Sequence, residues 1–224
     1  MTAIRMPIAT LAVLLLAGRV AIAAEPVAMV ENVTGTSAGV APLDYLAAGK
    51  SIRLAASDTL ILDYLHSCIR ETITGASLVI GAQQSTVHGG KVTRETVSCD
   101  GGQLALSSDQ SQKSETIVFR KSSTTGTKLP AAQHTLYGLS PLFRLPGPGV
   151  LTVERLDKPG EKIVLAIAAT DLVRRHFYDF ASHDHALTGG GLYRASFSTA
   201  SIVFRLADTA VAGTAPPVTR LLQL

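Results

Sequence analysis

The amino-acid sequence predicts an all-β fold, in which a small antiparallel meander or sandwich is followed by a second domain that resembles a β-sandwich. Short runs of apolar and β-branched residues recur along the chain, and clusters of Gly, Ser, Asn and Asp separate them. Turns are this frequent in antiparallel sheets and sandwiches. Only 5% of the residues are aromatic and none is Trp, so many aliphatic side chains must form the core.

Residues 1–23 have the three parts of a secretory signal peptide. Arg5 lies in a short basic region, an apolar run extends from Met6 to Ala17, and small residues precede the expected cleavage site near Ala23/Ala24. We therefore expect a Sec-type signal and a mature protein in the periplasm or outside the cell. The alternative is an anchor helix that is not removed, because Arg19 is unusual so close to a cleavage site. No later segment reaches the roughly 20 apolar residues of a spanning helix, so we expect no transmembrane segment in the mature chain.

The charge pattern bears on the partners of the mature chain. Loss of Arg5 and Arg19 with the signal lowers the formal net charge from +3 to +1, because no acidic residue leaves with them. This balance does not indicate a basic face of the kind that binds nucleic acid, so we expect no nucleic-acid partner. Residues 24–121 hold eight Lys and Arg against ten Asp and Glu, and residues 122–224 hold ten against seven. Opposite net charges favour packing of the two halves.

Residues 24–121 are predicted to form the first β domain. Its strands are expected at 28–33, 51–54, 59–65, 71–73, 77–80, 91–97, 103–106 and 115–119. Residues 43–48 and 107–113 have the patterns of short helices of one or two turns.

Residues 122–149 are predicted to connect the first domain to a second one at 150–224. Ser122 to Lys128 is small and polar, which indicates a linker or an exposed loop. Leu139 to Gly149 contains three prolines, so no regular structure is expected there. Strands of the second domain are expected at 150–155, 162–168, 191–197 and 201–206, with a hairpin turn at Asp157 to Gly160.

Cys68 and Cys99 are the two cysteines of the chain. In an exported protein they are predicted to form one disulfide. One alternative is a pair of buried free thiols, which would follow if the signal peptide were absent. The other is a Cys68 thiol nucleophile with His66 or His88 as its base, since a catalytic cysteine needs a base nearby. Cys99 offers a disulfide partner, which favours the bridge.

The stretch from Gly35 to Gly90 resembles the FecR-like periplasmic domain. The segments that match are Val33-Thr34-Gly35, Ala48-Gly49-Lys50, Ser57 to Leu62 and Ala76 to Gly81. Where that family usually has an Asp-Gly turn, this chain has His66-Ser67-Cys68, which suggests a turn held by a disulfide. The resemblance implies a β-rich, non-catalytic domain of the periplasm that acts through protein contacts. The transmembrane helix and anti-sigma segment of such a signal relay are not found in this sequence.

Two pairs of carboxylates could serve a glycosidase, namely Asp63 with Glu71 and Asp179 with Asp184. Glycosidase clefts usually carry aromatic platforms as well, and this chain has no Trp and five Tyr. We therefore interpret these acids as partners in surface ion pairs with Arg70, Arg174 or Arg175. No Gly-x-Ser-x-Gly motif is present either, and no catalytic residue is predicted.

The segment from Arg174 to Phe180 combines charged and aromatic side chains more densely than any other. One interpretation is an edge strand or loop that packs Phe177 and Phe180 inward and leaves the charges in water. The other is a ligand site for an anion, made of Arg174, Arg175, His176, Tyr178 and Asp179. The first interpretation is favoured.

Four residues have spacing that a metal site could use: His176, Asp179, His183 and His185. In a strand, His183 and His185 would point to the same face. Flanking Ala, Ser and Gly residues favour a loop instead, so we predict solvated histidines, no metal and no cofactor.

The function that follows is an exported, non-catalytic interaction module that binds an envelope protein or a glycan. The alternative is a cell-envelope hydrolase or metalloenzyme that uses the region of His176, Asp179, His183 and His185. A purely structural accessory protein is not distinguished from the first class by the sequence.

Overall fold

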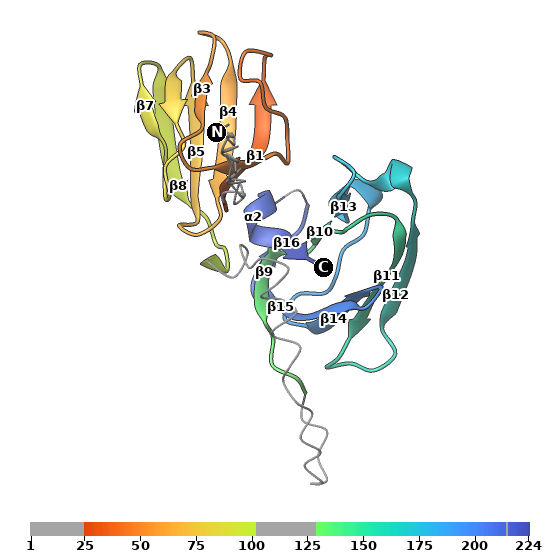
Figure 1. The fold of residues 1–224 in the computed structure, drawn as a ribbon. Coiled ribbons are helices and arrows are strands. Elements are labelled where there is room, and N and C mark those ends of the chain that lie inside the picture. The colour runs from red at the N-terminus through yellow and green to blue at the C-terminus, as the bar shows by residue number, and fades with distance from the viewer. Residues whose placement is uncertain (1–24, 102–128, 214) are drawn as a thin grey trace, which may run out of the picture.

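The computed structural model describes residues 25–101, 129–213 and 215–224, and these residues form two β-sandwich units with a short helix between them (Figure 1). The predicted all-β class is confirmed. Among the described residues, no helix is long and apolar enough to cross a membrane. The signal peptide, the strands expected at 103–106 and 115–119, the helix expected at 107–113 and the linker Ser122 to Lys128 lie outside the described residues.

The N-terminal unit consists of a five-stranded and a three-stranded sheet, and every strand pair in them is antiparallel. The five-stranded sheet has the order β2-β1-β4-β5-β8. Its strands are β1 (Pro26–Thr34), β2 (Tyr45–Ala47), β4 (Thr59–Tyr64), β5 (Ile69–Thr74) and β8 (Lys91–Thr96). The smaller sheet contains β3 (Ser51–Arg53), β6 (Ser77–Val79) and β7 (Thr86–His88), in that order.

Alternation along the central strands explains this packing. In β4, Leu60, Leu62 and Tyr64 point into the core between the two sheets, whereas Ile61 and Asp63 point to the other face. Leu78 of β6 and Ile73 of β5 complete the same core.

The C-terminal unit repeats this architecture with different connections. Its large sheet has the order β12-β11-β14-β15-β9 and its small sheet the order β13-β10-β16. The strands of the large sheet are β9 (His134–Gly138), β11 (Gly149–Arg155), β12 (Lys162–Ile167), β14 (Leu192–Phe197) and β15 (Ala200–Val211). Those of the small sheet are β10 (Leu142–Arg144), β13 (Phe177–Asp179) and β16 (Leu221–Gln223). The pairs β9–β15 and β10–β16 are parallel.

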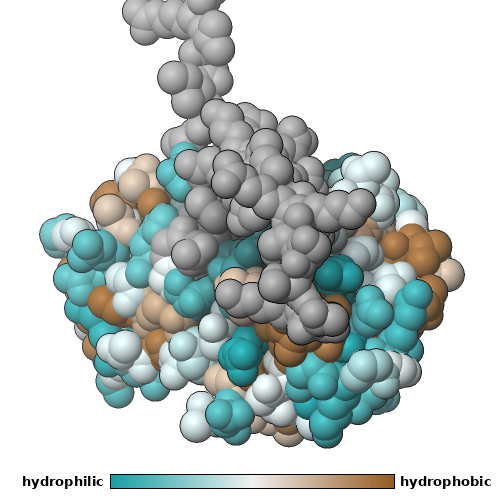
Figure 2. Space-filling view, turned by 90° about the horizontal axis from the view of Figure 1, so that it is seen from below, coloured by the Kyte–Doolittle hydropathy of each residue, from teal (hydrophilic) through white to brown (hydrophobic). Residues whose placement is uncertain are grey.

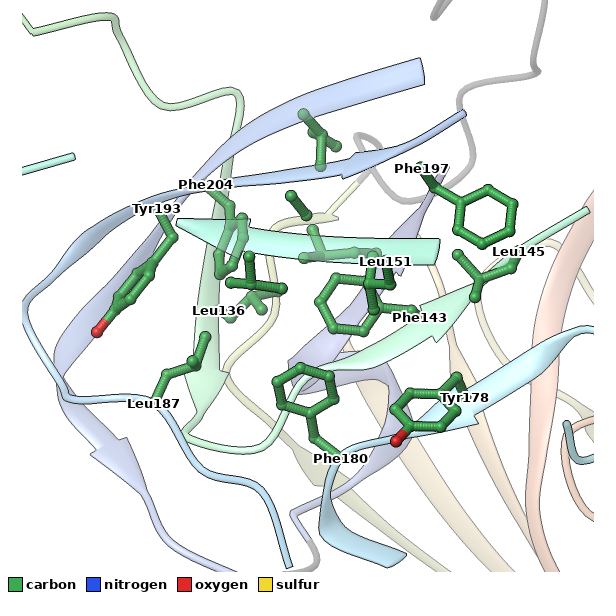
Figure 3. Close-up of a cluster of buried hydrophobic side chains, with 14 of the residues drawn as sticks. Leu136, Phe143, Leu145, Leu151, Tyr178, Phe180, Leu187, Tyr193, Phe197 and Phe204 are labelled. Carbon is green, nitrogen blue, oxygen red and sulfur yellow. The ribbon is translucent and has the colours of Figure 1, made fainter. Parts of the chain in front are cut away.

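Aromatic rings fill the core of the C-terminal unit (Figure 3). Phe143 and Phe180 pack with their ring centroids 5.0 Å apart, and Tyr193 stacks on Phe204 at 5.6 Å. The small number of aromatic residues in the chain is therefore concentrated in this unit, and the N-terminal core is mainly aliphatic.

The last ten residues connect the two units. The helix α2 (Pro217–Arg220) lies between them, and β16 extends directly from it into the small C-terminal sheet (Figure 1). A third apolar cluster, which we call the seam, contains Met29, Leu65, Leu142, Phe177, Val218 and Leu221. Met29 and Leu65 come from the N-terminal unit and the other four from the C-terminal unit and its tail, so the two units pack on each other.

The helix expected at residues 43–48 is wrong. Leu43 adopts a positive φ of 66°, which excludes it from a right-handed helix, and Tyr45–Ala47 is the strand β2. Pairing of β2 with β1 places Leu46 in the N-terminal core, so burial in the tertiary structure, and not local helix propensity, determines the conformation of this segment.

The expectation that Leu139 to Gly149 has no regular structure is also wrong. Leu142–Arg144 forms β10, and Pro141 and Pro146 flank this strand without interrupting it. The strand β9 also lies inside the expected connection at 122–149 and belongs to the large C-terminal sheet. The hairpin turn at Asp157 to Gly160 is present, with Gly160 at a φ of 101°.

Candidate functional site

The expected ligand residues of the segment 174–179 do not converge on one point. Arg174 and Arg175 lie at the tip of a tight hairpin closed by Val173 and Phe177, and both adopt positive φ values of 53° and 65°. Arg174 forms an ion pair with Asp44 of the N-terminal unit. Arg175 is exposed. The hairpin thus contributes an ion pair between the two units.

Tyr178 and Asp179 of the same segment have structural roles. Tyr178 and Phe180 are buried in the C-terminal core, and Phe177 is buried in the seam. Asp179 accepts hydrogen bonds from Arg220 at 2.5 and 3.0 Å. Its expected partners were Arg174 or Arg175, so that interpretation of Asp179 is wrong.

The three histidines of the expected metal site contact different groups. The Nδ1 atom of His176 lies 3.2 Å from the carbonyl oxygen of Leu145. The ring of His183 stacks on that of Tyr178 with the centroids 4.5 Å apart, and the rings of His185 and Phe180 meet edge to face with the centroids 5.3 Å apart. Within the parts of the chain that the structure describes, no group of three or more His, Cys, Asp or Glu side chains could hold a metal ion.

Cys68 and Cys99 form a disulfide, with their Cα atoms 5.6 Å apart. The predicted pair is confirmed, and Cys68 therefore has no free thiol with which to act as a nucleophile. The bridge joins the turn between β4 and β5 to the segment after β8, and Cys99 packs against the seam.

The acids Asp63 and Glu71 do not face each other across a cleft, because they point to opposite faces of one sheet. Glu71 points into the N-terminal unit, where Arg94 donates to it at 2.7 Å and the N–H of Ser85 at 3.1 Å. Asp63 points to the seam and lies 3.6 Å from Arg70. Both acids have fully buried side chains, so the expectation of surface ion pairs is wrong for them.

The C-terminal unit presents an open sheet edge at β12. Among the described residues, no strand pairs with the side of β12 that faces away from β11. One other outermost strand, β8, is equally long at six residues, and it carries Lys91, Arg94 and Glu95. Charges of this kind protect sheet edges from pairing with other strands. β12 has a single charge, Lys162, at its first position, so it lacks this protection.

Hydrogen bonding defines which backbone groups of β12 are free. The N–H of Arg155 donates to the carbonyl of Glu161 at 2.8 Å, which makes this the first bonded pair of the β11–β12 ladder. Bonded and non-bonded pairs alternate in an antiparallel ladder. The N–H and C=O groups of Lys162, Val164 and Ala166 therefore point outward from the sheet edge.

An apolar patch accompanies these free groups. Val150 and Val164 have exposed fractions of 55% and 57%, which are high for large apolar side chains, and Ala166 is exposed as well. Val150 is directly opposite Ala166, and Val164 is opposite Thr152, so the two valines are diagonal neighbours on one face. Figure 2 shows a brown patch at the right-hand end of the face it displays, the side on which Figure 1 draws β11 and β12.

Sequence reasoning found β12 as a strand and missed its place in the sheet. The signal available was the run Ile163 to Ile167, which is apolar on both faces of the strand and carries no charge. Such a run is typical of a buried strand, and only the order of strands shows that it lies at an edge.

A comparison with known proteins finds no matching family model, no matching curated protein and no matching solved structure.

Proposed function

We propose that the chain is an exported, non-catalytic binding module that recognises an extended segment of another protein by strand addition at β12. The observation that carries this proposal is the open, almost uncharged edge of β12, with outward backbone groups at Lys162, Val164 and Ala166. In strand addition the main chain of the partner supplies affinity, and its alternate side chains supply specificity.

The chemistry of the edge favours a protein segment over a glycan. Donors and acceptors alternate along β12 at the spacing of a β-strand, which matches the main chain of an extended peptide. The adjacent patch of Val150, Val164 and Ala166 is aliphatic, and it suits β-branched or aliphatic side chains at every second position of the bound segment.

Export and the FecR-like character of the N-terminal unit belong to the same proposal. A disulfide between Cys68 and Cys99 supports an oxidising compartment such as the periplasm. The two-sheet, antiparallel architecture of residues 25–101 supports the resemblance at the level of a β-rich domain. In this proposal the N-terminal unit is a scaffold and the C-terminal unit carries the binding edge.

Selection of peptides from a random library on the mature protein tests this function. We expect selected peptides to alternate aliphatic or β-branched residues with polar ones. Their affinity should fall at least tenfold for Val164→Lys, which places a charge on the edge, and for Ala166→Pro, which removes an outward N–H but no bond to β11. Thr93→Lys on the edge strand β8 is the matched control and should leave the affinity unchanged.

Two results would contradict the proposal. One is selection of no peptide above background, and the other is equal affinity of selected peptides for wild type and Val164→Lys. Binding of envelope glycans that survives both β12 variants would place the binding function elsewhere on the protein.

A further inference from the structure

Asp63 occupies an unusual position at the seam. It lies on β4 opposite Met29 of β1 and Arg70 of β5, and it points to the face that the C-terminal tail covers. Its side chain has no exposed surface, and neither carboxylate oxygen has a hydrogen-bond partner of ordinary geometry among the described residues. Burial without hydrogen-bond partners destabilises the charged form of a carboxylate.

The charged groups around Asp63 do not compensate for this burial. Arg70 is 3.6 Å from Asp63, but its Nε donates to Glu31 of β1 at 2.6 Å and its Nη1 lies 3.4 Å from Glu95 of β8. One guanidinium group therefore interacts with three carboxylates. Arg70 and Glu31 keep about a fifth of their side-chain surface exposed, so water screens both charges in part.

The elements packed against Asp63 provide little further stabilisation of its charged form. From α2, the backbone N–H of Val218 favours the charged form of the carboxyl. Arg220, the one ionisable residue of α2, commits its guanidinium to Asp179 and to the carbonyl oxygens of Ser140 and Ala215. Met29 of β1 is apolar.

Burial raises the pKa of Asp63 from its ordinary value of 3.8 to about 7, and the like charge of Glu31 acts in the same direction. Arg70 and the N–H of Val218 lower the pKa, but they do not cancel the effect of burial. The neutral, protonated carboxyl is therefore the form that suits the docked position.

We propose that Asp63 is a proton-dependent latch between the two units: α2 docks on the N-terminal sheet over the protonated carboxyl, and loss of the proton weakens this docking. The latch is independent of the β12 edge, which lies on the opposite side of the C-terminal unit from the N-terminal unit (Figure 1).

The direction of the pH dependence follows from linkage. Once α2 leaves, Asp63 meets water and its pKa returns toward 3.8, so the docked state binds the proton more tightly. Docking is strongest below about pH 4 and weakens by up to about tenfold per pH unit as the pH rises toward about 7. Above about pH 7 the carboxyl is ionised in both states, and docking becomes independent of this group.

Hydrogen exchange of backbone amides in α2 measures the docking. After correction for intrinsic exchange rates, we expect the protection of residues 218–220 to fall between pH 5 and 7 and to level off by pH 8. Protection of residues 194–196 in β14, inside the C-terminal sheet, is the internal control and should not follow this curve. In Asp63→Asn, whose side chain stays neutral, the protection of residues 218–220 should not depend on pH.

A titration of the Asp63 carboxyl carbon by NMR in the wild-type protein keeps the proposal testable if Asp63→Asn does not fold. We expect a midpoint near 7, and a lower midpoint in Glu31→Gln, because that change removes the like charge and frees Arg70. A wild-type midpoint near 4, or the same pH profile of exchange at residues 218–220 in wild type and Asp63→Asn, would overturn the latch.

Discussion

Arg220 links more parts of the molecule than its place near the end of the chain suggests. Its guanidinium binds both carboxylate oxygens of Asp179 and donates to the carbonyl oxygens of Ser140 and Ala215. Arg220 is buried and Asp179 is partly buried, with 5% and 15% of their side chains exposed. The pair therefore orients α2 against β13 and the loop before β10.

Removal of Arg220 should be costly because it leaves the partly buried carboxylate of Asp179 without its cation. We expect Arg220→Met to lower the free energy of unfolding by about 3 to 5 kcal/mol, measured by urea denaturation. Arg194→Met is the matched control, because Arg194 lies 3.8 Å from Glu154 in an exposed pair and its loss should cost under about 1 kcal/mol. Equal losses for the two variants would show that the pair with Asp179 contributes nothing beyond a surface contact.

Single residues also show where sequence reasoning reaches its limit. The disulfide was predictable because a chain with two cysteines has one possible internal pairing, and the predicted signal peptide favoured its oxidation. The partner of Asp179 was not predictable, since Arg220 is 41 residues away while Arg174 and Arg175 are near in sequence. The buried state of Asp63 depends on α2, which lies far along the chain, and no local pattern shows it.

At the level of elements, most of the long strands were predictable and several of the short ones were not. Alternating β-branched and apolar residues indicate β1, β4, β11, β12 and β14 close to their observed bounds. Of the three-residue strands, β3 and β6 were predicted, at 51–54 and 77–80, whereas β2, β7 and β13 were missed. Three residues span too little of the chain for a period of two to identify a strand in every case. Sheet order is set by contacts between distant segments, so the open edge of β12 could not be found by local pattern.

The disulfide stabilises the N-terminal unit by joining the β4–β5 turn to the end of β8. Cys68 and Cys99 are separated by 31 positions, and closing a loop of that size contributes about 3 to 4 kcal/mol in the chain-entropy account. We expect the Cys68→Ser, Cys99→Ser double variant to lose this amount in urea denaturation. Reduction of the wild type should give the same midpoint as the double variant, and a midpoint that reductant does not move would contradict this contribution.

For the whole molecule, the C-terminal segment determines how the two units are joined. α2 contacts β1 and β4 of the N-terminal unit, and β16 pairs in parallel with β10 of the C-terminal unit. The sequence predicted two β domains of opposite net charge, and the ion pair between Asp44 and Arg174 is a contact of that kind. It did not predict that Val218 and Leu221 of an apolar tail lie between the units, because a parallel pair of distant strands has no local signature.

Exchange of the β12 amides in the presence of a selected peptide tests whether the peptide binds by strand addition. In the free protein, the outward amides of Lys162, Val164 and Ala166 should exchange quickly, while those of Ile163 and Leu165 are protected by their bonds to β11. Addition of a saturating peptide should slow exchange at residues 162, 164 and 166 at least tenfold and leave residues 163 and 165 unchanged. Peptide binding that leaves these three amides exchanging at their free rates would contradict strand addition at β12.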